Sequence, residues 1–214
     1  MSDLPDIDVP GQLDEVTRRV SAEAPGETTT AMTVEISQEY PTDQADLWQA
    51  VTTADRLARW FAPVHGDLEL GGRYQVEGNA GGVVQTCEPP ERFTATWVMG
   101  EGHSLIDVRV EEIDADHSRL RLIHSGDVDN GFWQTYGPGA VGVGWDLSLL
   151  GLAGHIVSGA GRPPEADEWA AGEQAREFMR GSAVRWVDAA IAAGLDPDAA
   201  REAGGRTTSF YLGE

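Results

Sequence analysis

The sequence contains no lysine: its 15 basic residues are all arginine, set against 36 aspartates and glutamates. The formal net charge is therefore −21. So acidic a surface repels phosphate backbones and anionic lipid headgroups, and we expect no nucleic-acid partner and no membrane partner. High solubility or a salty cytoplasm accounts for the charge, with a cationic partner surface as the alternative.

Cysteine and targeting signals are also scarce. Cys87 is the single cysteine, which excludes an internal disulfide. The first ten residues are acidic and lack the basic and apolar regions of a secretory signal peptide. Both features indicate a cytoplasmic protein. Cys87 has no adjacent histidine or lysine to activate it, so we interpret it as an inert, packed thiol.

The longest apolar segment, Pro138 to Ser158, has the length of about 20 residues that a membrane span requires. Asp146 and His155 interrupt it and no arginine cluster flanks it, so we interpret it as a buried helix instead. Each glycine in it should cost about 1 kcal/mol relative to alanine. Either the glycines allow close packing or they leave room for a ligand, and both readings stay open. They are Gly142, Gly144, Gly151 and Gly154.

The region before this segment alternates short apolar runs with turn residues, a pattern typical of an antiparallel meander. After the first strand, helical spacing predicts two short helices, one capped by Thr42 or Asp43 and one ending before Pro63. The glycine-rich run 78–82 lacks the Lys-Ser/Thr of a phosphate loop and is interpreted as a hairpin turn. The predicted strands are 32–40, 64–70, 73–77, 83–87, 92–99, 103–113 and 117–125.

The register of the last three strands follows from keeping apolar side chains on one face, since a one-residue slip turns every side chain over. Closing the last hairpin with Ile113 opposite His117 meets this condition. A loop over 99–102 closes the hairpin before it. The shared face then carries Phe93, Ala95, Trp97, Ile106, Val108, Val110, Leu120, Leu122 and His124. The opposite face, expected to meet water, carries Asp107, Arg109, Glu111, Arg119 and Arg121, with Glu111 opposite Arg119.

Both ends of the chain fall outside the meander. Leu13, Val16 and Val20 have helical spacing before a linker, so residues 1–31 are predicted to form an arm. Residues 165–193 predict an amphipathic helix that ends at Gly194, followed by a short helix to Ala203. We divide the chain into the arm (1–31), a domain (32–159) and a helical extension packed on that domain (160–214). The apolar stripe of the long C-terminal helix could cover a pocket, pack behind the sheet or pair with a second copy, so a homodimer stays open.

Five sequence words occur in the order of a known family: 58–61, 67–74, 88–93, 96–97 and 120–126. Together they closely resemble SRPBCC proteins of the heat-shock-protein-90 ATPase activator homologue type, over about residues 32–158. The run 136–147 and the C-terminal helix resemble a bacterial subgroup of that family. The resemblance implies an α+β, START-like helix-grip fold, in which a curved antiparallel sheet wraps around a long helix, with extra C-terminal helices. It also implies a cavity for apolar ligands and supplies no fixed catalytic motif.

We therefore predict a binding module for a small hydrophobic molecule, without a cofactor. An alternative is a cyclase- or hydrolase-type enzyme acting on an apolar substrate in the same cavity, although no acid/base pair of diagnostic spacing is evident. A second alternative is a co-chaperone that activates an ATPase. The predicted pocket residues are Trp60, Tyr74, Phe93, Trp97, Ile106, Val108, Leu122, His124, Trp133, Tyr136 and Trp145.

His124 is the polar residue that the register points into this cavity. It is either a proton-transfer or ligand-orienting group, or a core histidine bonded to the backbone. His103 lies on the same hairpin, but two histidines without a third ligand make no zinc site, so no metal is predicted. Glu77, Asn79 and Asp146 are further candidate pocket groups, with surface roles as the alternative.

Overall fold

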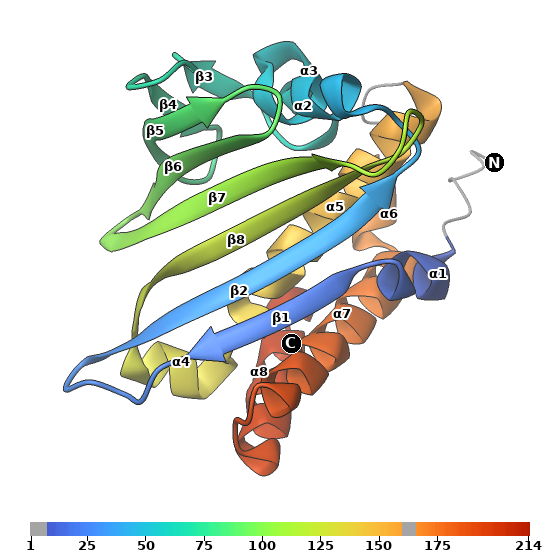
Figure 1. The fold of residues 1–214 in the computed structure, drawn as a ribbon. Helices are drawn as coiled ribbons and strands as arrows, with labels where there is room; N and C mark the ends of the chain where they lie inside the picture. The colour runs from blue at the N-terminus through green and yellow to red at the C-terminus, as the bar shows by residue number, and fades with distance from the viewer. Residues whose placement is uncertain (1–7, 160–165) are drawn as a thin grey trace. The chain divides into compact units, whose positions relative to one another are not determined.

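The strands form one curved antiparallel sheet in the order β1-β2-β8-β7-β6-β5-β4-β3 (Figure 1). A computed structural model describes residues 8–159 and 166–214. Its strands are β1 Thr17–Ala22, β2 Thr29–Tyr40, β3 Val64–Gly66, β4 Arg73–Val76, β5 Gly81–Glu88, β6 Arg92–Met99, β7 Gly102–Glu112 and β8 Ser118–Asp129. Its helices are α1 Val9–Asp14, α2 Gln44–Thr52, α3 Ala54–Trp60, α4 Asn130–Tyr136, α5 Gly139–Ser158, α6 Ala166–Ala171, α7 Glu173–Ala192 and α8 Pro197–Leu212.

The predicted register of β6, β7 and β8 is confirmed. Val110 pairs with Leu120, Val108 with Leu122 and Ile106 with His124. Across the other hairpin, Phe93 pairs with Val108 and Ala95 with Ile106. The two helices predicted after the first strand are also present as α2, capped by the Asp43 side chain, and α3.

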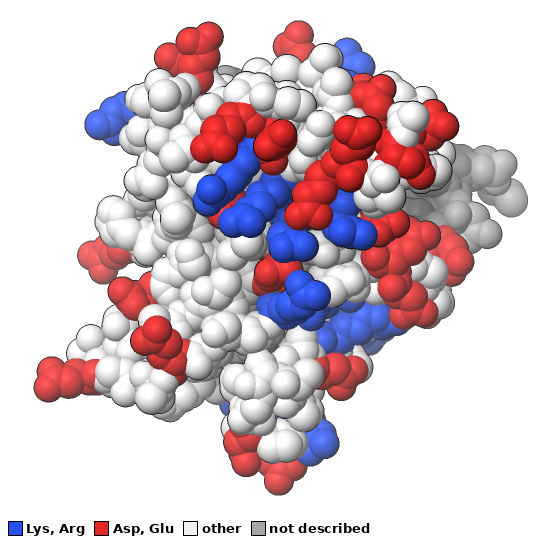
Figure 2. All heavy atoms as spheres, in the orientation of Figure 1, with Lys and Arg blue, Asp and Glu red and all other residues white. Residues whose placement is uncertain are grey.

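The water-facing side of these strands carries arginines in a cross-strand row. Arg92 is paired with Arg109, and Arg109 with Arg121. Like charges placed opposite each other are unfavourable, and Asp107 offsets them by accepting bonds from Arg92 Nε at 2.9 Å and Arg109 Nη2 at 2.8 Å. Figure 2 shows basic atoms gathered over β7 and β8 and surrounded by acidic ones. Glu111 lies opposite Arg119 as predicted.

The chain divides into two compact units. The terminal unit comprises residues 1–36, 128–147 and 162–214, and the sheet unit comprises residues 37–127 and 148–161. Strand β2 and helix α5 run from one unit into the other.

The terminal unit corrects the prediction for the N-terminal arm. The helix expected through Val20 ends at Asp14, and Thr17–Ala22 form strand β1. Leu13 and Val16 are both buried, as their apolar spacing predicted, but they lie in different structures. Leu13 is in helix α1, and Val16 is in the link between α1 and β1. Tertiary packing, rather than local periodicity, sets the helix end.

Two predictions for the C-terminal helices need correction. The helix expected over 165–193 is interrupted at Gly172, which separates α6 from α7; residue 165 lies outside the described residues. The last helix continues past Ala203 to Leu212. Its two central glycines do not end it, because Gly204 lies close to Val187 of α7, where an added Cβ would be 2.2 Å from Cγ2. Close contact between α7 and α8 outweighs the low helix propensity of glycine.

Helix α7 buries its apolar stripe within the terminal unit. It packs against α1, α8 and β1, and Figure 1 shows it alongside β1. Phe178 and Trp186 are each 1% exposed. The stripe is therefore buried by α1, α8 and β1 of the same chain.

A buried ion pair joins three elements of the terminal unit. Arg18 of β1 donates to Asp146 of α5 from Nη2 at 2.7 Å and from Nε at 3.0 Å, and both side chains are at most 5% exposed. Ser182 and Trp186 of α7 also donate to the Asp146 carboxylate, Trp186 Nε1 at 2.9 Å. Every charge here is bonded, which offsets the large cost of removing a carboxylate from water.

We expect Arg18→Met to lower the free energy of unfolding by about 3–5 kcal/mol, because it leaves a buried carboxylate without its cation. The matched control is Arg19→Met, since the neighbouring Arg19 is 64% exposed in its pair with Glu35 and should contribute at most about 1 kcal/mol. Urea unfolding followed by circular dichroism measures both variants. Equal losses in the two would contradict the structural role assigned to the pair.

Candidate functional site

The candidate site is the apolar face of β6, β7 and β8 in the sheet unit. One cross-strand row contains Phe93, Val108 and Leu122, and the next contains Ala95, Ile106 and His124. Trp97 and Ser104 begin a third row. Six of the predicted pocket residues therefore share one face of three neighbouring strands. Helix α2 lies at one end of this face. There the rings of Trp48 and Phe93 meet edge to face, with their centroids 6.1 Å apart.

His124 is the polar group in the middle of this face. Its Nε2 lies 2.7 Å from Ser104 Oγ, and the Ser104 hydroxyl donates to the Trp97 carbonyl at 2.9 Å. The single hydroxyl proton is thus used, so Nε2 carries a proton and donates to Ser104. Burial lowers the pKa of His124 to about 4, and the imidazole is neutral at physiological pH.

Tyr74 and Trp60 each use their polar atom for local structure. Tyr74 of β4 donates from its hydroxyl to the Thr96 carbonyl of β6 at 2.6 Å, and burial raises its pKa to about 12. Trp60 of α3 donates from Nε1 to the Ala50 carbonyl of α2 at 2.9 Å. Both are half-buried and present ring surface, while their hydrogen-bonding groups are engaged.

The other three predicted pocket residues belong to the terminal unit. Trp133 and Tyr136 lie on α4 and Trp145 on α5, so they are not members of the rows on β6–β8. Helix α4 itself was not predicted. Its cap is Asp129, whose side chain accepts from Phe132 N at 2.9 Å, a signal that the sequence Asp129-Asn130-Gly131 offered.

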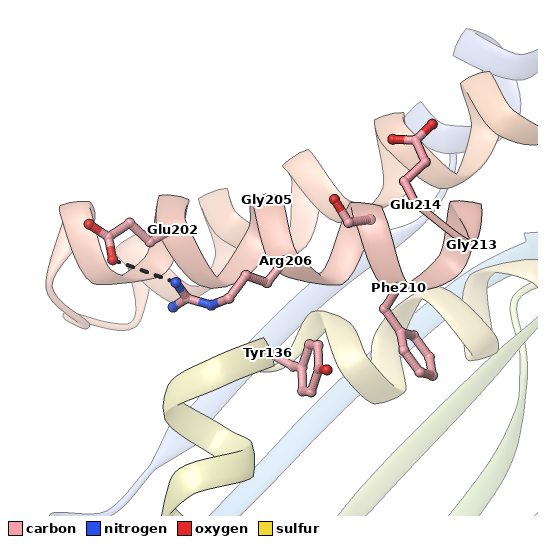
Figure 3. A pocket seen from close by; sticks show the side chains of 8 residues that line it. Tyr136, Glu202, Gly205, Arg206, Phe210, Gly213 and Glu214 are labelled. Atoms are coloured by element: carbon pink, nitrogen blue, oxygen red, sulfur yellow. Dashed lines mark ion pairs between the residues drawn. The ribbon is translucent and has the colours of Figure 1, made fainter.

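Tyr136 instead lines an open groove of about 610 Å³ along helix α8. Figure 3 shows its ring beside that of Phe210, with the pair Glu202–Arg206 further along the helix. The remaining lining residues are Gly205, Ser209, Gly213 and Glu214. The sequence did not reveal this groove, because residues 204–212 were not predicted to be helical.

A second cluster that sequence reasoning missed lies in the sheet unit around His155. Arg56 of α3 donates from Nε to His155 Nε2 at 2.8 Å and from Nη1 to Asp46 Oδ1 of α2 at 2.8 Å. The hydrogen bond from Arg56 lowers the pKa of Asp46. The His155 ring accepts at Nε2 and is buried, so this cluster ties α2 and α3 to α5. A lone histidine in an apolar helix was its signal in the sequence.

The remaining polar candidates have structural or surface positions. Asp146 is part of the buried ion pair with Arg18. Glu77 and Asn79 are exposed, and Asn79 lies in the turn between β4 and β5. Within residues 8–159 and 166–214, no group of three or more histidine, cysteine, aspartate or glutamate side chains could hold a metal ion.

The glycines of α5 mostly provide close packing. A Cβ on Gly142 would lie 2.1 Å from Trp186 Cε2, and one on Gly151 would lie 2.6 Å from the Trp60 carbonyl oxygen. A Cβ on Gly144 would lie 3.3 Å from the Tyr211 hydroxyl oxygen. Gly154 meets nothing within 4 Å and is exposed.

Helix α5 is long and apolar enough to cross a membrane by length and composition alone, a test that core helices of soluble proteins also pass. Val143, Leu149 and Leu152 are each at most 1% exposed. Its contacts with Trp186 and Trp60, and its paired Asp146, are those of a core helix.

A curved antiparallel sheet with two short helices after its first long strand and a long apolar helix after its last defines a helix-grip protein of the START-like class. The chain belongs to the family of Activator of Hsp90 ATPase homolog 1-like proteins, whose model matches residues 41–156. The predicted fold and family are thereby confirmed.

Solved structures show the same fold. The solution structure of CalU16 from Micromonospora echinospora is 29% identical, with a TM-score of 0.65, and covers 83% of this chain and 96% of its own. DynU16, described as a putative protein in the dynemicin biosynthetic locus, is 20% identical with a TM-score of 0.51, and covers 60% of this chain and 48% of its own. The Aha1 dimer from Colwellia psychrerythraea is 17% identical with a TM-score of 0.51, and covers 60% of this chain and 98% of its own. No protein of curated function matches the chain.

Substituting alanine for two glycines of α5 tests which of them lies in close packing and which faces open space. We expect Gly142→Ala to lower the free energy of unfolding by about 1–3 kcal/mol, because Trp186 must move. Gly154→Ala, in open space on the same helix, should raise it by up to about 1 kcal/mol. Thermal and urea unfolding measure both. A gain in stability at Gly142 would mean that the indole does not pack there.

His124 should make stability depend on pH in a defined window. Its pKa is about 4 when folded and about 6.5 when unfolded, so the unfolded chain binds the proton first as the pH falls. The stabilisation is complete above about pH 6.5 and is lost towards pH 4, by about 3 kcal/mol in total. Urea unfolding of the native protein and of His124→Gln across this range measures it. Parallel pH profiles would refute the assignment.

Proposed function

We propose that this protein binds a small hydrophobic molecule on the apolar face of β6–β8, within the helix-grip domain predicted over residues 32–159. The observation that carries the proposal is the buried His124–Ser104 pair set among Phe93, Trp97 and Ile106. A core that served stability alone would gain from apolar residues at this position. A polar pair in an apolar wall is the usual means of orienting a ligand.

The chemistry of this pair favours a ligand that is mostly apolar with one hydrogen-bonding group. The Ser104 hydroxyl both accepts from His124 and donates to a backbone carbonyl. The hydrogen-bonding group of such a ligand would replace one of these two partners of Ser104, so that no polar atom is left buried and unpaired. No cofactor is needed for this function.

One similar solved structure supports a role with small molecules. DynU16 is described as a putative protein in the dynemicin biosynthetic locus. An enzymatic role of the cyclase or hydrolase type has weaker support, because the Nε2 partner of His124 is a serine hydroxyl and not a carboxylate that would raise its basicity.

The test is direct detection of a ligand and of its site. Native mass spectrometry of the purified protein should show a bound apolar molecule, and N-phenylnaphthylamine fluorescence should show saturable binding that the extracted ligand competes away. Ile106→Trp should weaken binding about tenfold, or about 1.4 kcal/mol. Ile113→Trp, the same substitution at a site 42% exposed on the same hairpin, is the control and should leave binding unchanged.

Native protein that carries no ligand and shows no saturable dye binding would refute the proposal, independently of whether either variant folds. Circular dichroism establishes that both tryptophan variants are folded before their affinities are compared. Equal affinities of folded Ile106→Trp and Ile113→Trp would place binding elsewhere.

Membership of the Hsp90-activator family supports a second candidate, stimulation of a chaperone ATPase. An ATPase assay with an Hsp90-type chaperone separates it from ligand binding. Both roles are compatible with the cytoplasmic location that the sequence predicts. The family includes an Aha1 described as a dimer, which supports self-association of this chain as well.

A further inference from the structure

A ladder of four aromatic rings runs across the α4–α8 face of the terminal unit. Phe132 and Tyr136 have ring centroids 5.1 Å apart, Tyr136 and Phe210 are 5.6 Å apart, and Phe210 and Tyr211 are 5.4 Å apart. Phe210 is 63% exposed and Phe132 is 46% exposed. Exposed aromatic side chains that are already held in place are typical anchors of protein interfaces.

The groove along α8 lies beside this ladder. It is lined by Gly205 and Ser209, which lie four residues apart on α8, and by Gly213, which caps the C-terminus of the helix. Phe210 and Tyr136 form one wall (Figure 3). One face therefore carries both a protruding aromatic ring and a hollow of about 610 Å³. A surface that contains both a knob and a hole can pair with itself about a two-fold axis.

The two helices are fixed to each other before any partner binds. Arg206 of α8 donates from Nε to the Thr135 carbonyl at 2.7 Å, and Thr207 donates to the Tyr136 carbonyl at 2.7 Å. The aromatic rings of both helices are thus positioned in the free chain. Association loses less conformational entropy when the contact groups are already ordered.

The charges around the groove are balanced, unlike those of the whole chain. Glu202 lies 3.7 Å from Arg206, and Glu214 is paired with Arg176. Two chains with a net charge of −21 repel each other, and a locally neutral face minimises that repulsion, because charges beyond about 8 Å are screened at physiological salt. Electrostatics therefore favours this face as the contact between two copies.

We propose that two copies of this chain form a two-fold dimer through α8, with Phe210 of each copy inserted into the α8 groove of the other. A stable dimer buries about 800 Å² per partner, and one aromatic side chain supplies about 150–250 Å² of that area. The rest must come from the α8 backbone and the ladder. The dimer is accordingly concentration-dependent rather than obligate.

Sedimentation velocity of the full chain over about a hundredfold range of concentration tests the proposal. The native protein should shift from monomer to dimer, and Phe210→Ser should weaken association at least tenfold. Leu70→Ser is the matched control, because Leu70 is also exposed, at 65%, and lies in the sheet unit. Both positions are exposed, so both variants keep the fold, which circular dichroism checks.

Gly205→Leu tests the groove itself. An added Cβ there meets nothing within 4 Å, so the monomer tolerates leucine, and helix propensity improves. Filling the hole should abolish the dimer, whereas general stickiness would make the more hydrophobic variant associate more strongly. A native protein that stays monomeric, an equal effect of Leu70→Ser, or stronger association of Gly205→Leu would each overturn the proposal. Ligand binding on β6–β8 is measured separately and does not depend on the outcome.

Discussion

The two-residue period of β6, β7 and β8 is the constraint on which the rest of the sheet unit depends. One register places aliphatic and aromatic side chains on one face and arginines with carboxylates on the other. A slip by one residue would bury Arg109 and Arg121 and expose Val108 and Leu122. The candidate site inherits its composition from this choice, since the observed register places His124 opposite Ile106 and diagonally across from Ser104 on the apolar face.

The position of the long helix α5 depends on a different constraint, the distance to which its neighbours can approach it. Because the helix is apolar on nearly all sides, an amphipathic pattern does not determine which side faces the sheet. Gly142 admits the face of an indole, and Gly151 admits a backbone carbonyl. The low helix propensity of these residues is offset by contacts that a methyl group would prevent.

Sequence reasoning succeeded where a local rule and the tertiary fold agreed. Alternation placed His124 opposite Ile106, and the cap at Asp43 and the stop at Pro63 marked the two short helices. It failed where packing overrides local preference: the last helix was predicted to end at Ala203, yet α8 continues to Leu212 through Gly204, which lies close to Val187. Pairings distant in the sequence were equally hidden, because nothing near Arg18 or Arg56 indicates Asp146 or His155 as partners. The predicted pocket residues fall in both units.

The buried carboxylate of Asp146 also bears on how much of this chain belongs to one packed structure. The segment that defines the family starts at residue 41 and includes Asp146, while the cation that neutralises it comes from Arg18 and two further donors come from α7. A protein cut at the family boundaries would lose Arg18, Ser182 and Trp186, three side chains that bond the Asp146 carboxylate. In this chain the family match covers less than the packed structure, and the flanking segments supply bonded groups to its interior.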